Sequence, residues 1–455
     1  MMRIQHVATV VAVFLVVTCT TTTALRVPAS NGKWTWMSGP STECSAPNVG
    51  PTPASGAGCA NTLARPGARC CAHVYYDHVT GDAILWGGYG YDGAGKLGSL
   101  SDLWSFNGSA WQHRGGSLFR DNDVDSGRRN GDPIWPPARS YAAYAWDQAS
   151  RTFVIFSGQA DEQFLPDMWA LDGATLKWSF LGNFSAPAPR KWSNFWSADG
   201  SLWVLGGKNA EGGSYNDMWR FRMATTGANV TASNAEWQLV YNRTGQNFGV
   251  YTGPDAMPGA RHNAFTTALA SDQSLWMFGG SGWGSEKGGR GVVQDLWRFD
   301  TQTLRWSFQG GNAGDVEHDG RCAARGMPSA EALPTARHAG MNFDFATADG
   351  RMLVFGGEHH PAPTPAQMPS VRAENLLIFN DLWTYDMLHG TWTFEAGNCD
   401  TPNVHNATRG ACGVPSEANA PQSRYGGNAW TDADGNAWLF GGGFKGYTND
   451  MWRFA

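Results

Sequence analysis

A pattern of apolar and polar positions recurs six times along the chain. In each copy an apolar run leads into a pair of glycines, a loop follows, and an acidic residue, an apolar residue and Trp come next. In the second copy Ser157 replaces the first glycine. A long period with four short apolar runs per copy predicts repeated four-stranded β-units. The acidic residues, spaced 50 to 86 residues apart, are Asp102, Asp167, Asp217, Asp295, Asp381 and Asp450.

Each copy is predicted to begin with an Arg that opens its first strand. A tight turn such as Asp147–Ser150 separates this strand from the second, which ends in the glycine pair. The acidic residue begins the third strand, and a further Trp marks the fourth. We expect the tryptophans of the third and fourth strands to fill the spaces between neighbouring units. The fourth-strand residues are Trp111, Trp178, Trp237, Trp306 and Trp392.

The sixth copy has no fourth strand before the sequence ends at Ala455. The segment Lys33–Met37 resembles the fourth strands of other copies, such as Leu176–Phe180. We therefore expect it to pair with the last three strands and close a ring, which would cover an otherwise open sheet edge.

These glycine pairs and Asp-apolar-Trp motifs resemble the kelch-repeat family, whose fold includes the central domain of galactose oxidase. The resemblance extends from about residue 33 to residue 455 and implies an all-β, six-bladed kelch β-propeller closed by its N-terminal strand. Residues 25–455 would form this single domain. The expected blade cores lie near 69–111, 139–178, 190–237, 261–306, 337–392 and 424–455, the last together with 33–37.

The first 24 residues are predicted to be a signal peptide. Arg3 precedes the apolar run from Val7 to Val17, and small residues lead to an expected cleavage after Ala24. No later stretch approaches about 18 continuous apolar residues. We expect a secreted protein without a membrane span. The net charge of -6 gives no indication of nucleic-acid binding.

Seven cysteines remain after the predicted cleavage, and an oxidising compartment permits disulfides. We predict two disulfide bonds, Cys44 with Cys59 and Cys399 with Cys412, each within one long loop. The pairing of Cys70, Cys71 and Cys322 stays open, with a free thiol or an intermolecular bridge among them. Five glycosylation motifs in predicted loops or turns would be used in a eukaryotic secreted protein; they are at Asn107, Asn183, Asn229, Asn242 and Asn406.

Strands that alternate in direction bring all the long connections to one face, where function is expected. The six Arg residues should surround the channel mouth on this face. They would either bind a ligand carboxylate or sulfate, or pair with the six Asp residues, since unpaired cations would repel one another. Some kelch domains recognise acidic peptides with Arg at this strand position. The candidates are Arg69, Arg139, Arg190, Arg261, Arg337 and Arg424.

Aromatic residues among glycines and polar residues are further ligand-binding candidates on this face. Their rings would stack against a sugar or a peptide side chain, or fold back to fix flexible loops. They are Tyr89, Tyr91, Trp283, Phe444 and Tyr447.

Two clusters have side chains that bind metals. Glu358, His359 and His360 are consecutive, with His338 and His262 on neighbouring strands, and Asp315, Glu317, His318 and Asp319 form the other group. Adjacent histidines without a spaced third ligand equally describe solvated loop residues. No cofactor is predicted, and copper or another metal enters only if the protein is an oxidase.

The predicted function is binding of a protein or glycan partner through the loop-rich face. The alternative is an extracellular enzyme with its site at the channel mouth, either a metal-dependent oxidase resembling galactose oxidase or a sugar epimerase or mutarotase. Motifs for a nucleophilic serine or a phosphate-binding loop do not occur in the sequence. Kelch propellers serve many functions, so the resemblance does not choose between these alternatives.

Overall fold

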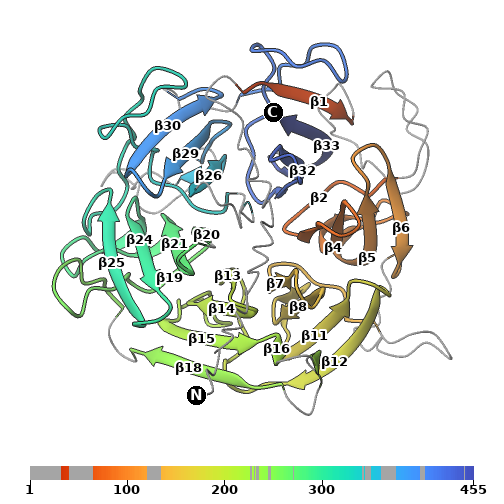
Figure 1. The fold of residues 1–455 in the computed structure, drawn as a ribbon, viewed down its shortest axis with the longest axis horizontal. Helices are drawn as coiled ribbons and strands as arrows, with labels where there is room; N and C mark the ends of the chain where they lie inside the picture. The colour runs from red at the N-terminus through yellow and green to blue at the C-terminus, as the bar shows by residue number, and fades with distance from the viewer. Residues whose placement is uncertain are drawn as a thin grey trace, which may run out of the picture.

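The computed structural model describes residues 32–39, 65–119, 135–225, 228–229, 231, 235–243, 247–269, 271–340, 343, 350–359, 376–399, 405–444 and 446–455. These residues form antiparallel strands, as the all-β prediction expects. Figure 1 shows the larger sheets arranged around a common centre, with strands β6, β12, β18, β25, β30 and β1 at the rim. Within the described part of the chain, no helix has the length and apolarity needed to cross a bilayer.

Each larger sheet is built from consecutive strands. The first contains β2 (Arg69–Cys70), β3 (His73–Asp77), β4 (Asp82–Tyr91), β5 (Leu97–Phe106) and β6 (Trp111–Gly115). The second contains β7 (Ala143–Asp147), β8 (Thr152–Phe156), β11 (Asp167–Asp172) and β12 (Lys177–Asn183). The third contains β13 (Asn194–Ala198), β14 (Ser201–Leu205), β15 (Asp217–Arg222) and β18 (Trp237–Asn242).

The remaining sheets follow the same order, with one exception in the sixth. The fourth contains β20 (Phe265–Leu269), β21 (Ser274–Phe278), β24 (Leu296–Asp300) and β25 (Arg305–Gly310). The fifth contains β26 (Arg351–Phe355), β29 (Leu382–Asp386) and β30 (Thr391–Ala396), and most of its expected first strand lies outside the described residues. The sixth contains β31 (Asn428–Thr431), β32 (Ala437–Gly443), β33 (Tyr447–Phe454) and β1 (Trp34–Ser38).

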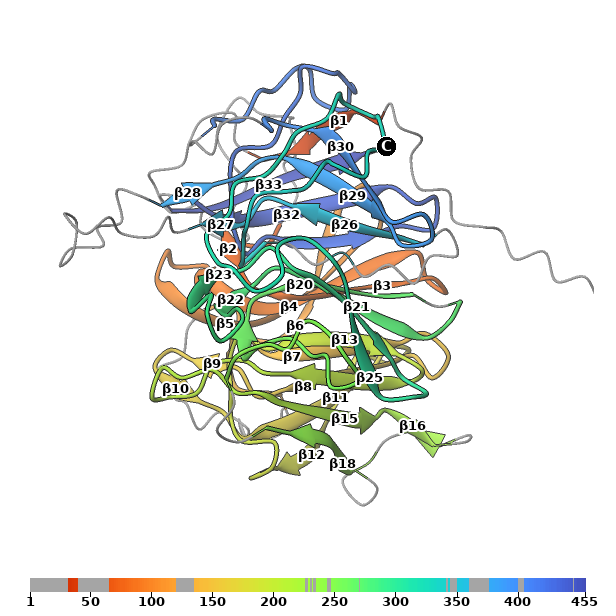
Figure 2. The same ribbon diagram turned by 90° about the vertical axis from the view of Figure 1, so that its left-hand side faces the viewer.

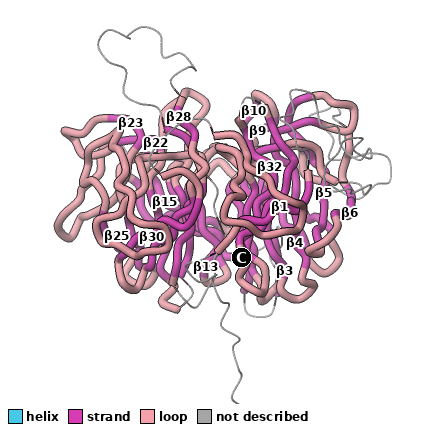
Figure 3. Tube along the Cα trace, turned by 90° about the horizontal axis from the view of Figure 1, so that it is seen from above, coloured by secondary structure: helices cyan, strands magenta, loops and turns pink. Residues whose placement is uncertain are grey.

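Short strands extend the connections between the second and third strands of several sheets. Figures 2 and 3 place β9–β10, β22–β23 and β27–β28 on one face of the molecule. This agrees with the prediction that these connections share a face. These strands are β9 (Gln159–Ala160), β10 (Gln163–Phe164), β22 (Ser281–Trp283), β23 (Arg290–Val292), β27 (Glu358–His359) and β28 (Leu377–Ile378). Elsewhere, β16 (Ala224–Thr225) and β17 (Ala228–Asn229) lie between β15 and β18, and β19 (Arg261–His262) precedes β20.

The core lies between the sheets rather than inside any one of them. Strand β8 is buried along its whole length because neighbouring sheets cover both of its faces, whereas β12 at the rim buries only Trp178 and Leu181. One apolar cluster joins each pair of consecutive sheets, and another joins the sixth sheet to the first. As predicted, the fourth-strand tryptophans belong to these clusters, so they stabilise the contacts between sheets.

The N-terminal strand pairs with the last strand of the chain, as the sequence predicts. In the antiparallel ladder Trp34 is opposite Phe454, and Trp36 is opposite Trp452. The Trp34 ring is 1% exposed and lies 5.4 Å from the ring of Phe355, which belongs to the fifth sheet. Strand β1 therefore joins the two ends of the sequence and also packs against the neighbouring sheet.

An Arg–Asp–Trp unit recurs in every copy of the repeat. In the first copy, the Arg69 guanidinium donates to both oxygens of Asp102 at 2.7 Å, and to the carbonyl oxygens of Gly67 and Gly87. The indole nitrogen of Trp104 donates to the same carboxylate at 2.6 Å. Equivalent bidentate pairs join Arg139 to Asp167, Arg190 to Asp217, Arg261 to Asp295, Arg337 to Asp381 and Arg424 to Asp450.

We predict that replacing Trp34 with Ala destabilises the whole fold. The substitution removes a buried ring from the contact between two sheets, and such a loss costs about 3–5 kcal/mol. Val79→Ala is the control because Val79 is 66% exposed, and a change at such a position stays within about 0.5 kcal/mol. Urea unfolding of both variants measures the difference, and equal midpoints would contradict the role given to β1.

Breaking one buried ion pair is expected to cost far more than breaking a surface pair. Arg261→Met leaves the Asp295 carboxylate buried without its cation, which should lower the free energy of unfolding by about 3–5 kcal/mol. In the matched control, Arg298→Met removes a surface pair with Asp272 and should cost under about 1 kcal/mol. Chemical denaturation compares the two variants, and similar losses would show that the buried pairs are not required.

Stability should fall in acid as the buried carboxylates are protonated. Burial alone would raise the pKa of Asp450, but the Arg424 guanidinium and the Trp452 indole hold that pKa well below its usual range. A depressed folded-state pKa stabilises the fold above the unfolded value of about 3.9, and this stabilisation is lost as pH falls toward the folded value. Unfolding free energies measured between about pH 6 and pH 2 should therefore decline less steeply for Asp450→Asn than for the wild type. Parallel curves would contradict this assignment.

Candidate functional site

A closed ring of backbone hydrogen bonds surrounds the centre of the molecule. At the position two residues after each of the six Arg residues, the backbone is left-handed, with φ between 54° and 62°. The amide of each such residue donates to the carbonyl oxygen of its counterpart in the preceding sheet, over 2.7 to 3.5 Å, and Cys71 donates to Gly426. We call these six residues the central ring; they are Cys71, Tyr141, Trp192, Asn263, Ala339 and Gly426.

The central ring constrains the backbone and leaves the side chains free to differ. A left-handed conformation costs a non-glycine residue roughly 1–2 kcal/mol, so the surrounding structure must impose it on the five members that are not glycine. Because main-chain groups make the ring, its geometry does not depend on residue type. The identity of the side chains can therefore follow the needs of a ligand.

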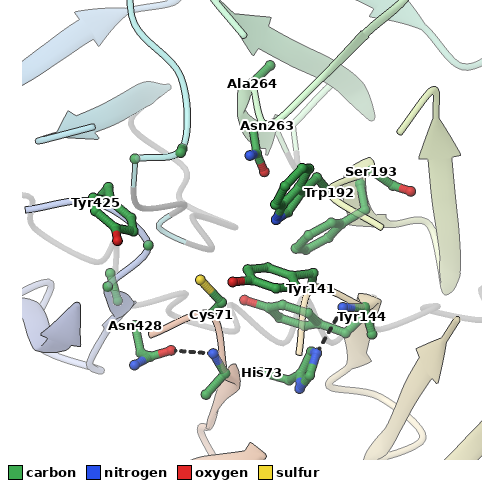
Figure 4. Close-up of a pocket in the computed structure, with 18 of the residues that line it drawn as sticks. Cys71, His73, Tyr141, Tyr144, Trp192, Ser193, Asn263, Ala264, Tyr425 and Asn428 are labelled. Atoms are coloured by element: carbon green, nitrogen blue, oxygen red, sulfur yellow. Dashed lines mark hydrogen bonds between the residues drawn. The ribbon is translucent and has the colours of Figure 1, made fainter. Parts of the chain in front are cut away.

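A cavity opens beside the central ring, with an empty volume of about 880 Å³ that includes its opening to solvent. Its wall is aromatic where Tyr141, Tyr144 and Trp192 lie, with Tyr425 across the space (Figure 4), and Phe195 is a further aromatic lining residue. In the order of the central ring, Ala339 and Gly426 lie across from Tyr141 and Trp192, and Gly340 and Gly427 line the cavity next to them in the sequence. The space exists because central-ring members of very different size face one another.

Four further groups give the cavity polar character. The thiol of Cys71, the amide of Asn263, the hydroxyl of Tyr425 and the carboxyl of Glu358 belong to lining residues, and the described part of the lining contains neither Lys nor Arg. In Figure 4 the side chains of Cys71, Tyr141 and Tyr425 surround the same space. Such a combination of aromatic walls and a few polar groups is typical of ligand pockets.

Two other polar lining residues are occupied in holding sheets together. His73 faces the Trp86 carbonyl through Nδ1 at 3.1 Å, and its Nε2 accepts from the Ala142 amide at 3.2 Å, which fixes a neutral tautomer (Figure 4). Burial lowers the pKa of His73 to about 3. Asn428 links sheets in the same way, because its Oδ1 accepts from the Ala72 amide at 2.9 Å. Both residues position the cavity wall.

Among the acidic residues that the structure describes, Glu358 combines burial with a place in the cavity wall. Burial raises the pKa of its carboxyl to about 7, and its Oε1 lies 3.7 Å from Nε2 of His338. A second pair, Glu317 with His359, lies alongside, with 3.5 Å between Oε2 and Nδ1. Burial also raises the pKa of Glu317 to about 7. Near neutral pH, Glu358 is therefore able both to donate and to accept a proton.

The predicted metal clusters do not assemble in the part of the chain that is described. There, no three His, Cys, Asp or Glu side chains are grouped so as to hold an ion. His360 lies outside the described residues. In the second cluster, His318 is 3.8 Å from Asp315, and Glu317 turns toward His359. His262 stacks on Trp192 with 5.7 Å between ring centroids, and burial lowers its pKa to about 3.

The six Arg residues are not available to a ligand, which corrects the prediction that they bind one. Each is at most 1% exposed and is held by its Asp partner, so the paired alternative is confirmed. Burial of a cation requires such compensation. The positions that were predicted to attract an anion therefore maintain the fold instead.

The five predicted aromatic residues are half-buried rather than fully exposed. Tyr89 and Tyr91 both lie against Tyr447, with ring centroids 5.8 and 6.3 Å apart. Trp283 belongs to β22 of another repeat, and Phe444 lies beyond the end of β32. Three tyrosines thus form one group, which favours the interpretation that they pack on one another at the face of the sheet.

The predicted disulfide between Cys399 and Cys412 is wrong, because Cys399 is bonded to Cys322. The loop that contains Cys322 runs along strand β30, which ends just before Cys399: the amide of Gly326 donates to the Phe394 carbonyl at 2.8 Å, and that of Ser329 to the Trp392 carbonyl at 2.9 Å. Contact in the fold, rather than closeness in sequence, brings the two cysteines together. Cys412 is also disulfide-bonded, and Cys44 and Cys59 lie outside the described residues.

Four of the glycosylation motifs have exposed asparagines, at Asn107, Asn183, Asn242 and Asn406. The side chain of Asn229 is not among those described. The central ring was missed in the sequence because its six residues share no chemical type. Each of them lies two positions after one of the six Arg residues, and this constant spacing could have identified them.

Comparison with known proteins supports the repeat assignment. A family model, the KLHDC2/KLHL20/DRC7 Kelch-repeats domain, matches residues 59–228, which contain the first two copies of the repeat and the third up to its fourth strand. No curated protein gave a match. The matched segment is less than half of the 455 residues, but the same Arg–Asp–Trp unit continues through the remaining copies. The chain therefore carries kelch repeats.

Proposed function

We propose that the protein is a secreted, closed, six-bladed kelch propeller that recognises a protein partner by taking one of its side chains into the central cavity. The observation that carries this proposal is the central ring, which presents Tyr141, Trp192 and Asn263 to one cavity. Kelch repeats favour an interaction module over other uses of the fold.

Packing and bonding support the closed form of the propeller. Apolar clusters join every sheet to the next and the sixth to the first. The hydrogen bonds of the central ring follow the same circular order. Secretion is supported by the predicted leader and by the bond between Cys322 and Cys399, because disulfides persist in oxidising compartments.

The chemistry of the cavity favours a cationic or neutral side chain. Among the described lining residues, Glu358 is the one that carries a carboxyl group, and none is Lys or Arg. Aromatic rings attract a Lys or Arg head group through their negative faces, and a carboxylate adds a charge-assisted hydrogen bond. In this cavity an acidic side chain would find no Lys or Arg among the described lining residues to pair with, and the negative faces of the aromatic rings would not attract it. A sugar would also stack on the aromatic wall, and therefore serves as the competing ligand class in the test.

A second function, acid–base catalysis on a sugar, is favoured by one observation. The carboxyl of Glu358 lines the cavity with a pKa of about 7, which suits proton transfer near neutral pH. Catalytic turnover of reducing sugars, lost in Glu358→Gln, would establish that function. The copper-dependent alternative has no comparable support, because three suitable ligands do not come together among the described residues.

We predict that immobilised peptide libraries will select peptides containing Lys or Arg. Glu358→Gln should weaken their binding roughly tenfold or more, because it removes a hydrogen bond to a charged group. Wild-type binding should strengthen as pH rises through about 7, where the carboxyl ionises. Gln302→Ala in an exposed turn between β24 and β25 is the control and should leave binding unchanged.

A glycan array is probed with the same preparations. If glycans are selected and peptides are not, the ligand is a sugar rather than a protein. Selection of acidic peptides, or binding that is unaffected by Glu358→Gln, would contradict the proposed role of the cavity.

A further inference from the structure

Two consecutive cysteines lie in the wall of the cavity. Cys70 ends β2 and is fully buried, whereas Cys71 belongs to the central ring and lines the cavity. Both thiols are free, and their sulfur atoms are 2.8 Å apart. Elsewhere in the described residues, Cys322, Cys399 and Cys412 are already oxidised to disulfides. Among the described cysteines, the adjacent pair is thus the reduced exception.

The environment of Cys71 holds its sulfur at the cavity surface. A Cβ atom added to Gly426 would lie 2.7 Å from the Cys71 sulfur, so the thiol occupies the space that a side chain would take in the neighbouring sheet. The Tyr141 side chain lies beside the same thiol in the cavity wall. Figure 4 shows the sulfur directed into the space between Tyr141 and Tyr425. A small molecule that enters the cavity therefore reaches Cys71 before Cys70.

A bond between neighbouring cysteines differs in kind from the bridge between Cys322 and Cys399. Consecutive Cα atoms are about 3.8 Å apart, which is shorter than the roughly 4.4–6.8 Å that disulfides normally span. The Cα atoms of Cys322 and Cys399 are 6.0 Å apart, within that range. A disulfide forced into a shorter span is strained, and strained disulfides are the readily reduced, labile ones. The adjacent pair is therefore suited to reversible chemistry.

We propose that Cys70 and Cys71 form a reversible redox site in the cavity wall, which a low-molecular-weight disulfide oxidises and a low-molecular-weight thiol reduces. The Cys71 thiolate attacks one sulfur of the small disulfide and forms a mixed disulfide, and the first small thiol leaves. The Cys70 thiolate then attacks the Cys71 sulfur, which forms the bond between the two cysteines and releases the second small thiol. Two protein thiols are oxidised as one small disulfide is reduced to two thiols.

The surroundings set the rate of this exchange. Burial raises the pKa of the Cys71 thiol well above its ordinary value, and the hydrogen bond and charge of Cys70 raise it further. The thiolate is the attacking species, so oxidation should accelerate as pH rises. Oxidation also removes the S–H group of Cys71 from the cavity wall. A ligand that contacts this thiol would consequently bind the two redox states differently.

The test uses the purified full chain and oxidised glutathione at a series of pH values from about 8.5 upward, because the pKa of the Cys71 thiol lies above that of an ordinary cysteine. After incubation the protein is denatured, its free thiols are alkylated, and the peptide containing both cysteines is analysed by mass spectrometry. We expect this peptide to carry no alkyl group and to weigh two hydrogens less than the reduced form. Dilute dithiothreitol should restore two alkylated thiols in it while Cys322 and Cys399 remain bonded.

Single substitutions separate the two steps. Cys70→Ser removes the thiol that closes the bond, so glutathione should remain attached to Cys71. Cys71→Ser removes the thiol that faces the cavity, and the buried Cys70 should then stay free. Two alkylated cysteines in the treated wild type, or glutathione that persists on its Cys71, would overturn the proposal. Since none of these measurements uses a ligand, their outcome is independent of the proposed binding function.

Discussion

The buried Arg–Asp–Trp unit is the interaction on which the rest of the molecule depends. Each guanidinium donates four hydrogen bonds, two of them to the carboxylate, and the indole of the same strand donates a further one to that carboxylate. Removal of such charges from water is offset only when the pair is bidentate and its remaining groups are bonded. The unit therefore tolerates little displacement, and it fixes the first strand, the glycine pair and the third strand relative to one another in every copy.

The central ring follows from this constraint. The Arg residue is anchored, so the chain two residues later reaches the same place in each repeat and bonds to its counterpart in the preceding sheet. The carbonyl of the Arg residue is also used: that of Arg139 accepts from the Gly88 amide at 2.9 Å, which ties one sheet to the next. At Gly87 a Cβ atom would lie 3.0 Å from the Arg139 carbonyl, and at Gly88 it would lie 2.7 Å from the Cys70 carbonyl of the same sheet, so both close approaches favour glycine. Residue type is thus restricted at the Arg and glycine positions and is relaxed at the central ring.

The contrast between positions where residue type is restricted and positions where it is not explains what the sequence could and could not predict. The Asp-apolar-Trp motif located the third strands, and the likeness of Lys33–Met37 to a fourth strand located the partner of β33, because both depend on local pattern. The sequence could not decide the role of the Arg residues, because the same side chain can form an internal ion pair or bind a ligand. Their burial in the structure decides it. The bond between Cys322 and Cys399 depends on two loops that meet 77 residues apart, and no local pattern records such a contact. The cavity was hidden for a related reason: it arises from differences among equivalent positions, whereas repeats are recognised by what their copies share.

The unequal sizes of the central-ring residues also explain why ligand contact and thiol chemistry coincide. Large rings at Tyr141 and Trp192 face Ala339 and Gly426, so the empty space lies toward the small residues. Cys71 stands between Gly426 and Tyr141 in the ring, at the border of the two halves. A ligand stacked on the aromatic wall must therefore lie close to the sulfur. Tyr141, which lies beside both the cavity and the Cys71 sulfur, would contact the same ligand. Occupancy of the cavity and the chemistry of Cys71 are then linked through a single side chain, without any movement of the sheets.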